Sequence, residues 1–169
     1  MAPQQTHSTP KVGVQAAAVI SGSFLSGAMA SLSMMVIPVL LDTNPDPSHT
    51  LRQWVRLYHY GHIILPALSV GTCGLYSYAA LSGRSPRPAT YAKAALATII
   101  MVPFTWLVMV PTNNTLFGLE ASGPSVTAAD WDMVQGLVVR WAWLHATRSV
   151  APLVGAIVGF RGLIREFGP

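Results

Sequence analysis

Two short segments of this chain carry histidine, tyrosine and arginine at spacings that would bring them together on helix faces. Tyr58 stands four residues before His62, and His145 stands three residues before Arg148. Residues three or four apart are neighbours on a helix surface. A neutral histidine can accept a proton from a substrate, while a nearby arginine stabilises the oxyanion that forms. The pattern therefore predicts proton abstraction beside a fixed positive charge.

Arg148 is unusual because the residues around it are apolar. Only 12 residues separate it from Arg161; as a helix they span about 18 Å, less than the roughly 30 Å hydrocarbon layer of a membrane. A helix that crosses this layer must start near Trp141, which places Arg148 about 10 Å inside it. Burying an arginine there costs at least about 2.5–3.5 kcal/mol. We expect Arg148 to face a bundle interior in a functional role, with a structural ion pair as the alternative.

The low charge of the whole chain indicates a membrane protein. Only 9% of its 169 residues are charged, 51% are hydrophobic, and the mean hydropathy is +0.46, whereas soluble domains carry about 25% charged residues. Residues 12–41, 57–83 and 94–119 contain no Asp, Glu, Lys or Arg. Since a helix needs roughly 20 apolar residues to cross the hydrocarbon layer, each interval is long enough for one span.

These intervals and the segment around Arg148 predict an all-α fold, a four-helix transmembrane bundle with up-down topology. Pro45 and Pro47 should break the chain after the first helix, and Pro111 should end the third. The polar residues 112–129 would then form the longest connection and a candidate lid. The predicted domain covers residues 14–163, with helices at about 14–41, 51–81, 91–110 and 130–162, and residues 1–13 form a mobile tail.

Threading four helices up and down separates two ends of the bundle. One end collects most of the Lys and Arg residues, so the positive-inside rule predicts that both termini lie in the cytoplasm. The other end collects the start of the second helix, the end of the third and the start of the fourth. Besides the residues already singled out, this second end is expected to hold Trp54, His59, Asn113, Asn114 and Trp141. As an alternative, the tryptophans and His59 could be simple anchors at the membrane interface.

Missing patterns limit the cofactors that the chain could hold. The single cysteine, Cys73, excludes an intrachain disulfide and a cysteine-rich metal site. We find no P-loop, dinucleotide fingerprint or HExxH motif, so no cofactor is predicted. His59, His62 and His145 leave a bound metal as an open alternative, although no carboxylate accompanies them.

The sequence also limits the partners that the chain could bind. No basic patch is interleaved with aromatic residues, so nucleic acid is not an expected partner. The lipid bilayer is expected to surround the helices. Gly155 and Gly159 form a GxxxG pattern, which predicts tight packing against a neighbouring helix or against a second subunit in a homo-oligomer.

Three strings carry a family resemblance. QWVRLYHYGH, VPTNNTLFGL and RWAWLHATRS, in this order and spacing, resemble the anthrone oxygenase-like family, small four-span membrane proteins of fungal aromatic polyketide pathways. The resemblance extends over residues 14–163. It implies that a small aromatic polyketide, an anthrone of the emodin-anthrone type, is oxidised to the anthraquinone by molecular oxygen without flavin or nicotinamide. It also implies a place in the endoplasmic reticulum or derived vesicles.

Together with the placement of polar residues at the second end of the bundle, the resemblance leads to a hypothesis for their roles. His145, Arg148, His62 and Tyr58 are the expected catalytic residues. A histidine, His145 or His62, would remove a proton from the central carbon of the anthrone, and Arg148 with Tyr58 and Asn114 would hold the enolate oxygen. The expected substrate-binding residues are Trp54, His59, Asn113, Asn114 and Trp141.

Three other functions remain open at this point. A copper or iron ion held by the histidines would make the protein a metal-dependent membrane oxygenase. A non-enzymatic tetraspan scaffold would need its packing glycines and tolerate loss of His145 and Arg148. In a small transporter, Arg148 would bind an anion, although four spans without an internal repeat are few for that purpose.

Overall fold

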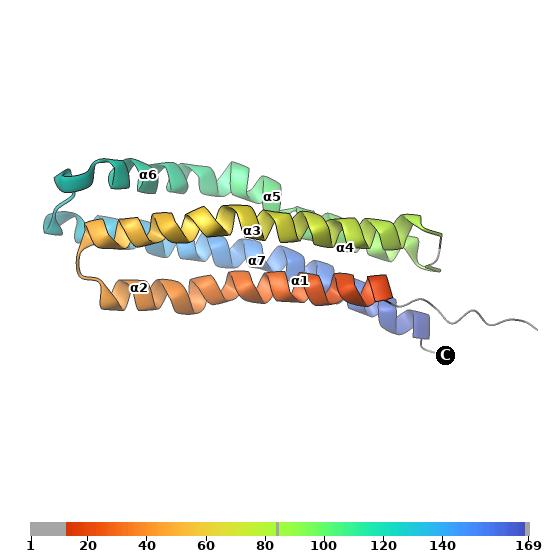
Figure 1. Cartoon of the computed structure of the whole chain (residues 1–169). Coiled ribbons are helices and arrows are strands. Elements are labelled where there is room, and N and C mark those ends of the chain that lie inside the picture. Colours follow the sequence, from red (N-terminus) through yellow and green to blue (C-terminus); the bar gives the residue numbers. More distant parts are fainter. Residues whose placement is uncertain (1–12, 84, 168–169) are drawn as a thin grey trace, which may run out of the picture.

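Four long helices run up and down in a computed structural model of the chain, which describes residues 13–83 and 85–167 (Figure 1). Each is long and apolar enough to cross a membrane: a first span Gly13–Thr43, a second Pro47–Leu81, a third Pro88–Ala121 and a fourth Ala128–Glu166. The predicted four-helix transmembrane fold is confirmed, and the protein is an integral membrane protein. The predicted tail over residues 1–13 lies outside the described residues, except for Gly13.

The spans are divided by two π-helical turns, which interrupt the first and third. The first span consists of α1 (Gly13–Ser31), η1 (Leu32–Val36) and α2 (Ile37–Thr43), and the second is α3 (Pro47–Leu81). The third consists of α4 (Pro88–Ile99), α5 (Met101–Phe104), η2 (Thr105–Met109) and α6 (Val110–Ala121). Two short 3-10 turns, η3 (Gly123–Ser125) and η4 (Ala128–Asp130), lead to α7 (Trp131–Phe167). η1 and η2 are thus the only π turns in the described residues.

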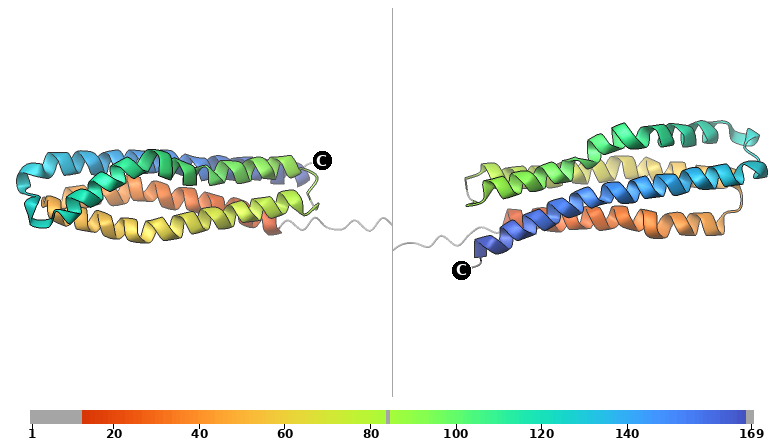
Figure 2. Two further views of the ribbon diagram at one scale, coloured as in Figure 1. Left: turned by 90° about the horizontal axis from the view of Figure 1, so that it is seen from above. Right: turned by 180° about the vertical axis from the view of Figure 1, so that it is seen from behind.

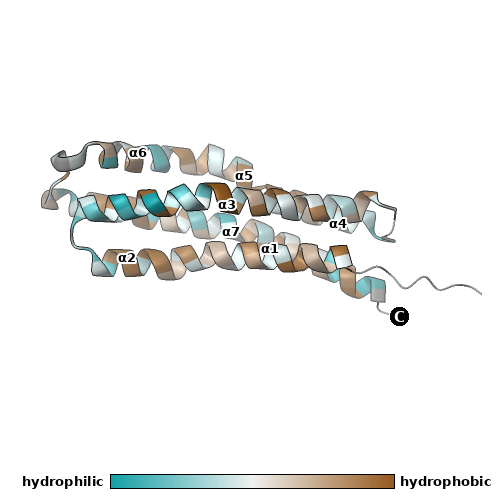
Figure 3. Ribbon diagram, viewed as in Figure 1, coloured by the Kyte–Doolittle hydropathy of each residue, from teal (hydrophilic) through white to brown (hydrophobic). Residues whose placement is uncertain are grey.

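The spans form a closed ring of neighbours, in which the first and third each pack against the second and fourth. The start of α1 and the end of α7 lie at the same end of the bundle, as up-down topology requires (Figure 1). At the opposite end α6 diverges from α3, and the third span changes direction between α4 and α6 (Figure 2). Hydrophilic residues of α3 are concentrated in the half that faces α6 (Figure 3).

The third span is longer than predicted, because Pro111 does not end it. The helix continues to Ala121, so residues 112–121 belong to the span, and the candidate lid over 112–129 shrinks to the short connection before α7. Pro111 lies in the first turn of α6, directly after the π turn η2. A proline is tolerated in a first turn because its missing N–H is not needed there.

The second span also starts earlier than predicted, because a proline is again accommodated in a first helical turn. The helix begins at Pro47 instead of about Leu51, since Asp46 caps it by accepting a hydrogen bond from the Ser48 N–H at 3.0 Å. Asp is a favoured N-cap residue, and a proline in the first helical position has a backbone angle already suited to the helix. Pro47 therefore starts the helix that the sequence suggested it would delay.

The GxxxG pattern packs within the chain. A Cβ atom on Gly155 would lie 2.8 Å from the Ala94 carbonyl oxygen of α4, and one on Gly159 would lie 2.7 Å from the Tyr76 hydroxyl of α3. Both glycines therefore bring α7 close to its neighbours in the bundle, which is one of the two alternatives that the pattern predicted. A homo-oligomer, if formed, would need a different surface.

Gly155→Ala is expected to destabilise the fold by about 1–3 kcal/mol, the usual effect of overpacking a tight contact. A lower midpoint of thermal unfolding in detergent would show it. Gly136→Ala on the same helix is the matched control, since a Cβ there would meet nothing within 4 Å. Gly136→Ala should unfold at or slightly above the wild-type midpoint, and equal loss in both variants would contradict this view of the packing.

Candidate active site

A cavity of about 350 Å³ lies between α3, the third span and α7, with Leu32 of the first span completing its wall. Most of the lining is apolar, and the polar side chains gather on the faces of three helices. Drug-sized ligands occupy cavities of roughly 300–1,000 Å³ with few polar groups. The polar lining residues are Tyr58, His62, Thr105, Asn113, His145 and Arg148.

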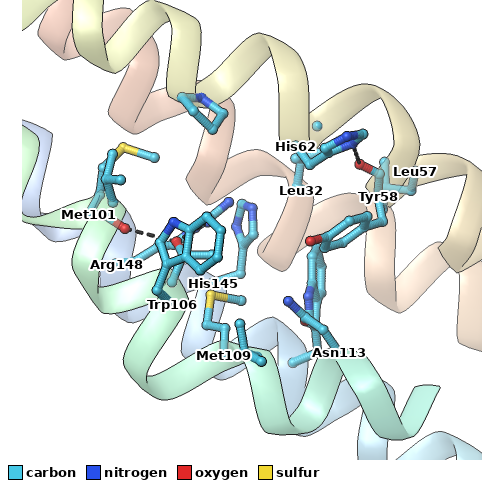
Figure 4. Close-up of a pocket in the computed structure, with 16 residues that line it drawn as sticks. Leu32, Leu57, Tyr58, His62, Met101, Trp106, Met109, Asn113, His145 and Arg148 are labelled. Atoms are coloured by element: carbon cyan, nitrogen blue, oxygen red, sulfur yellow. Dashed lines mark hydrogen bonds between the residues drawn. The ribbon is translucent and has the colours of Figure 1, made fainter. Parts of the chain in front are cut away.

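Arg148 projects from α7 into this cavity (Figure 4). Its side chain is buried, and its Nη1–H donates a hydrogen bond to Thr105 Oγ1 at 2.6 Å. Its Nε–H has no partner, and over residues 13–83 and 85–167 the single ion pair joins Arg52 to Asp46 at the surface. A buried cation without a carboxylate is costly, so the cavity is suited to an anionic or anion-forming ligand.

Arg148 lies deeper than the sequence suggested. It stands at the middle of the 39-residue helix Ala128–Glu166, and its partner Thr105 stands at the middle of the third span. The helices extend far beyond the roughly 20 residues that cross the hydrocarbon layer. The polar side chains of α7 and the third span that line the cavity therefore lie near mid-length of the bundle and not close to one end.

His145 is almost fully buried, at 1% exposure, and lies one turn before Arg148 on the same face of α7. Its Nδ1 is 3.4 Å from Ser33 Oγ of the first span. The ring packs on Trp141, with a centroid separation of 4.7 Å and an interplanar angle of 36°. His145 thus has one nitrogen engaged by the protein and a ring held from two sides.

Tyr58 and His62 form a second pair, on α3. Their rings stack, 5.3 Å apart at 10°, and the His62 Nδ1–H donates to the Tyr58 carbonyl at 3.0 Å. The same bond leaves His62 Nε2 free to accept a proton. Tyr58 points its hydroxyl across the cavity toward α7 (Figure 4), whereas His62 is exposed at the outer side of the cavity.

The remaining predicted residues divide into those that line the cavity and those that do not. Asn113 and Trp141 line it, and Asn113 Oδ1 is buried without a partner. Trp54 lies behind the wall, in contact with the rings of Tyr58 at 5.5 Å and Trp141 at 5.8 Å. Its place supports the two residues that do reach the cavity.

Asn114 and His59 are not part of the cavity wall. Both are exposed, because each is one residue further along its helix than a lining residue and so faces about 100° away. Asn113 takes the place expected of Asn114. His59 instead packs edge-on against Tyr60, with ring centroids 5.4 Å apart.

The sequence reasoning missed two hydroxyl residues, Ser33 and Thr105. Ser33 contacts His145 and Thr105 contacts Arg148, and each of the two hydroxyl residues lies in a π turn. Their position in charge-free intervals, level with Arg148, was the available signal. Serine and threonine are common in transmembrane helices, so that signal is weak.

The histidines do not converge on a common point. His59 and His62 have ring centroids 5.9 Å apart, and no group of three His, Cys, Asp or Glu side chains suited to a metal is found within the described ranges.

Comparison with known proteins gives one consistent result. A family model described as anthrone oxygenase matches residues 54–158, the part of the chain that contains the cavity residues of α3, the third span and α7. No solved structure matches the chain.

Similar curated proteins come from several fungi. An anthrone oxygenase (dmxR16) of Cryptosporiopsis sp. (strain 8999) is 56% identical, with 98% of both chains covered. The anthrone oxygenase nsrD of Aspergillus novofumigatus (strain IBT 16806) is 60% identical over 94% of this chain and 98% of its own. The monooxygenase hypC of Dothistroma septosporum (strain NZE10 / CBS 128990) is 44% identical over 88% of this chain and 81% of its own.

Proposed function

Because this chain belongs to the anthrone oxygenase family, we propose that it converts an anthrone to the corresponding anthraquinone with molecular oxygen. The observation that carries the proposal is the placement of His145 and Arg148 side by side in the wall of an apolar cavity. One can remove a proton, and the other can hold the negative charge that results. The substrate is an aromatic polyketide of the emodin-anthrone type.

The shape and opening of the cavity favour a flat apolar substrate. Trp106 and His62 are exposed lining residues on η2 and α3, so the cavity opens between these two helices toward the surrounding lipid. The exposed Leu107 and Ile63 beside them are apolar. A tricyclic anthrone dissolved in the bilayer could enter sideways through this opening without crossing water.

The proposed reaction starts at the central methylene carbon of the anthrone. A histidine takes one proton from it, and the electron pair moves to the carbonyl oxygen to give an aromatic enolate. The Arg148 guanidinium and the Tyr58 hydroxyl, which both line the cavity, stabilise that oxygen. In a site of low dielectric, such an interaction is far stronger than in water.

Oxygen then reacts with the electron-rich carbon. The enolate supplies two electrons, a C–O bond forms, and the peroxide takes back the proton held by the histidine. Loss of water, made from the distal OH group of the hydroperoxide and the remaining hydrogen of that carbon, leaves the second ketone. One anthrone and one O₂ give one anthraquinone and one water, so the substrate is the source of all the electrons.

The test is an assay of membranes that contain the protein, following oxygen uptake and quinone absorbance with several anthrones. We expect turnover well above spontaneous oxidation, with one O₂ consumed per quinone and one water formed. Membranes from the same host without the protein are the control. No acceleration with any anthrone would favour a scaffold. Stoichiometric copper or iron in the purified protein, together with loss of activity when a chelator is added, would favour a metal-dependent oxygenase.

We infer that both termini face the cytoplasm, since Arg87, Lys93, Arg161 and Arg165 lie at the end of the bundle where α1 starts and α7 ends. The fungal relatives favour the endoplasmic reticulum or vesicles derived from it. Protease protection of tags at each terminus in sealed microsomes would establish the orientation.

A further inference from the structure

We propose that the two π turns share one role. Each presents a hydroxyl group that positions one of the two polar cavity residues of α7, His145 and Arg148. Ser33 in η1 positions His145, and Thr105 in η2 positions Arg148. The inference rests on the proposed function, in which His145 moves a proton and Arg148 holds an oxyanion. It adds two positioning residues from spans that contribute no base or cation themselves.

The π turns place these hydroxyls where an uninterrupted α-helix would not. The Ile37 N–H bonds to the Leu32 carbonyl, and the Val110 N–H bonds to the Thr105 carbonyl, so each ring closes over five residues instead of four. The extra residue rotates the helix that precedes it relative to the helix that follows. Such turns are rare and are often found at functional sites, and here both contact the same short segment of α7.

Thr105 holds the guanidinium through an oriented chain of hydrogen bonds. Its Oγ1–H donates to the Met101 carbonyl at 2.8 Å, which leaves its lone pairs to accept Arg148 Nη1–H at 2.6 Å. Because a hydroxyl has one hydrogen, these two bonds fix the direction of both groups. One arm of the guanidinium is thereby anchored to the third span, which fixes how the rest of the group faces the cavity.

Ser33 of the first span contacts the imidazole of His145. Its side chain is buried, and Oγ lies 3.4 Å from His145 Nδ1. When Nδ1–H donates to Ser33 Oγ, this bond selects the tautomer in which Nε2 carries a lone pair and can serve as the base.

A hydroxyl in an apolar helix often does no more than bond to its own backbone, and the chain offers matched examples. Thr115 Oγ1 donates to the Pro111 carbonyl at 3.1 Å, on the same span as Thr105. Ser31 Oγ donates to the Ala28 carbonyl at 2.8 Å, on the same span as Ser33. Among the described residues, the hydrogen bonds of these two hydroxyls stay within their own helices, so Thr115 and Ser31 separate a general effect on the helix from an effect on the site.

The first part of the test compares Thr105→Val with Thr105→Ser and Thr115→Val. Valine keeps the branched shape and removes the hydroxyl, so kcat should fall about 10- to 100-fold, as expected when a catalytic group is misplaced, while KM changes little. Thr105→Ser should restore most of kcat, and Thr115→Val should behave as wild type. Wild-type kcat in Thr105→Val would overturn the inference for Arg148.

The corresponding test for His145 compares Ser33→Ala with Ser31→Ala. Wild-type kcat in Ser33→Ala would overturn the inference for His145.

The second part asks whether Thr105 acts through Arg148. In an Arg148→Met background, adding Thr105→Val should cause no further loss of kcat, since methionine has no N–H to donate to the Thr105 hydroxyl. Losses that multiply would mean that Thr105 has an independent, structural effect, and would overturn the inference.

A third readout does not depend on anthrone oxidation. In protein labelled with ¹⁵N-arginine, an anchored Arg148 should give separate Nη signals, identified by their absence in Arg148→Lys. They should merge in Thr105→Val and persist in Thr115→Val. Persistence in Thr105→Val overturns the positioning role even if the protein is active, while merging supports it even if every anthrone assay fails.

Discussion

His145→Gln is expected to lower turnover of the anthrone about 10²- to 10⁴-fold, the range in which a positioned general base contributes. Glutamine is close in size to histidine and retains polar atoms, so the buried site should keep its packing. It cannot accept the proton of the substrate. Steady-state oxygen uptake by purified protein in lipid nanodiscs would measure the loss as kcat.

The comparison variant for this experiment is His62→Gln. His62 also lines the cavity, with a free Nε2, but it lies exposed at the outer side, where it can meet the substrate as it enters. We expect a smaller fall in kcat, with the larger part of the effect on KM. If His62→Gln abolishes turnover and His145→Gln retains it, His62 is the base and the roles of the two histidines are reversed.

Arg148→Met is expected to separate activity from stability. Removing the cation should lower kcat about 10²- to 10³-fold, as when one donor to a developing oxyanion is lost. The same change removes a buried charge that has no carboxylate partner within the described ranges. Replacing buried charges by apolar residues of similar size is often neutral or stabilising, so thermal unfolding should occur at the same or a higher temperature.

Arg140→Met provides the matched control, because Arg140 lies on the same helix and is exposed. It should leave kcat unchanged. A transporter or a scaffold predicts a different pattern for Arg148→Met, in which quinone formation in the membrane is the same for the variant, the wild type and empty membranes. A variant that is both inactive and strongly destabilised would show that Arg148 mainly supports the fold.

The fold could be predicted from the sequence because each of the first three spans contains a long interval without charged residues. Uncharged intervals fix where helices cross the membrane to within a few residues, as the first span Gly13–Thr43 shows. Prolines were the source of the errors at Pro47 and Pro111. A proline ends a helix only if its N–H is needed there, and after a π turn or a capping aspartate it is not needed.

The site could be predicted only where it depends on depth and helix periodicity. His145, Arg148, Tyr58 and His62 were located in this way, and the structure places all four in one cavity wall. The choice between Asn113 and Asn114 depends on the rotation of α6 about its axis, which η2 sets.

The same rotation explains why Ser33 and Thr105 were missed. A π turn adds one residue to a helical turn, and no local pattern of apolar residues reports its presence. Contacts that depend on such a turn join spans that are far apart in sequence, as the 112-residue separation of Ser33 and His145 shows. They become visible only once the four helices are packed.

The sideways opening between α3 and η2 has a consequence for how this protein meets its substrate. If anthrone arrives from and quinone returns to the hydrocarbon phase, occupancy of the site depends on the mole fraction of anthrone in the lipid. The amount dissolved per litre of buffer does not set the rate. Adding empty lipid or detergent at constant total anthrone then lowers the mole fraction of anthrone in the membrane and so lowers the rate. The membrane itself acts as the store of substrate for the enzyme.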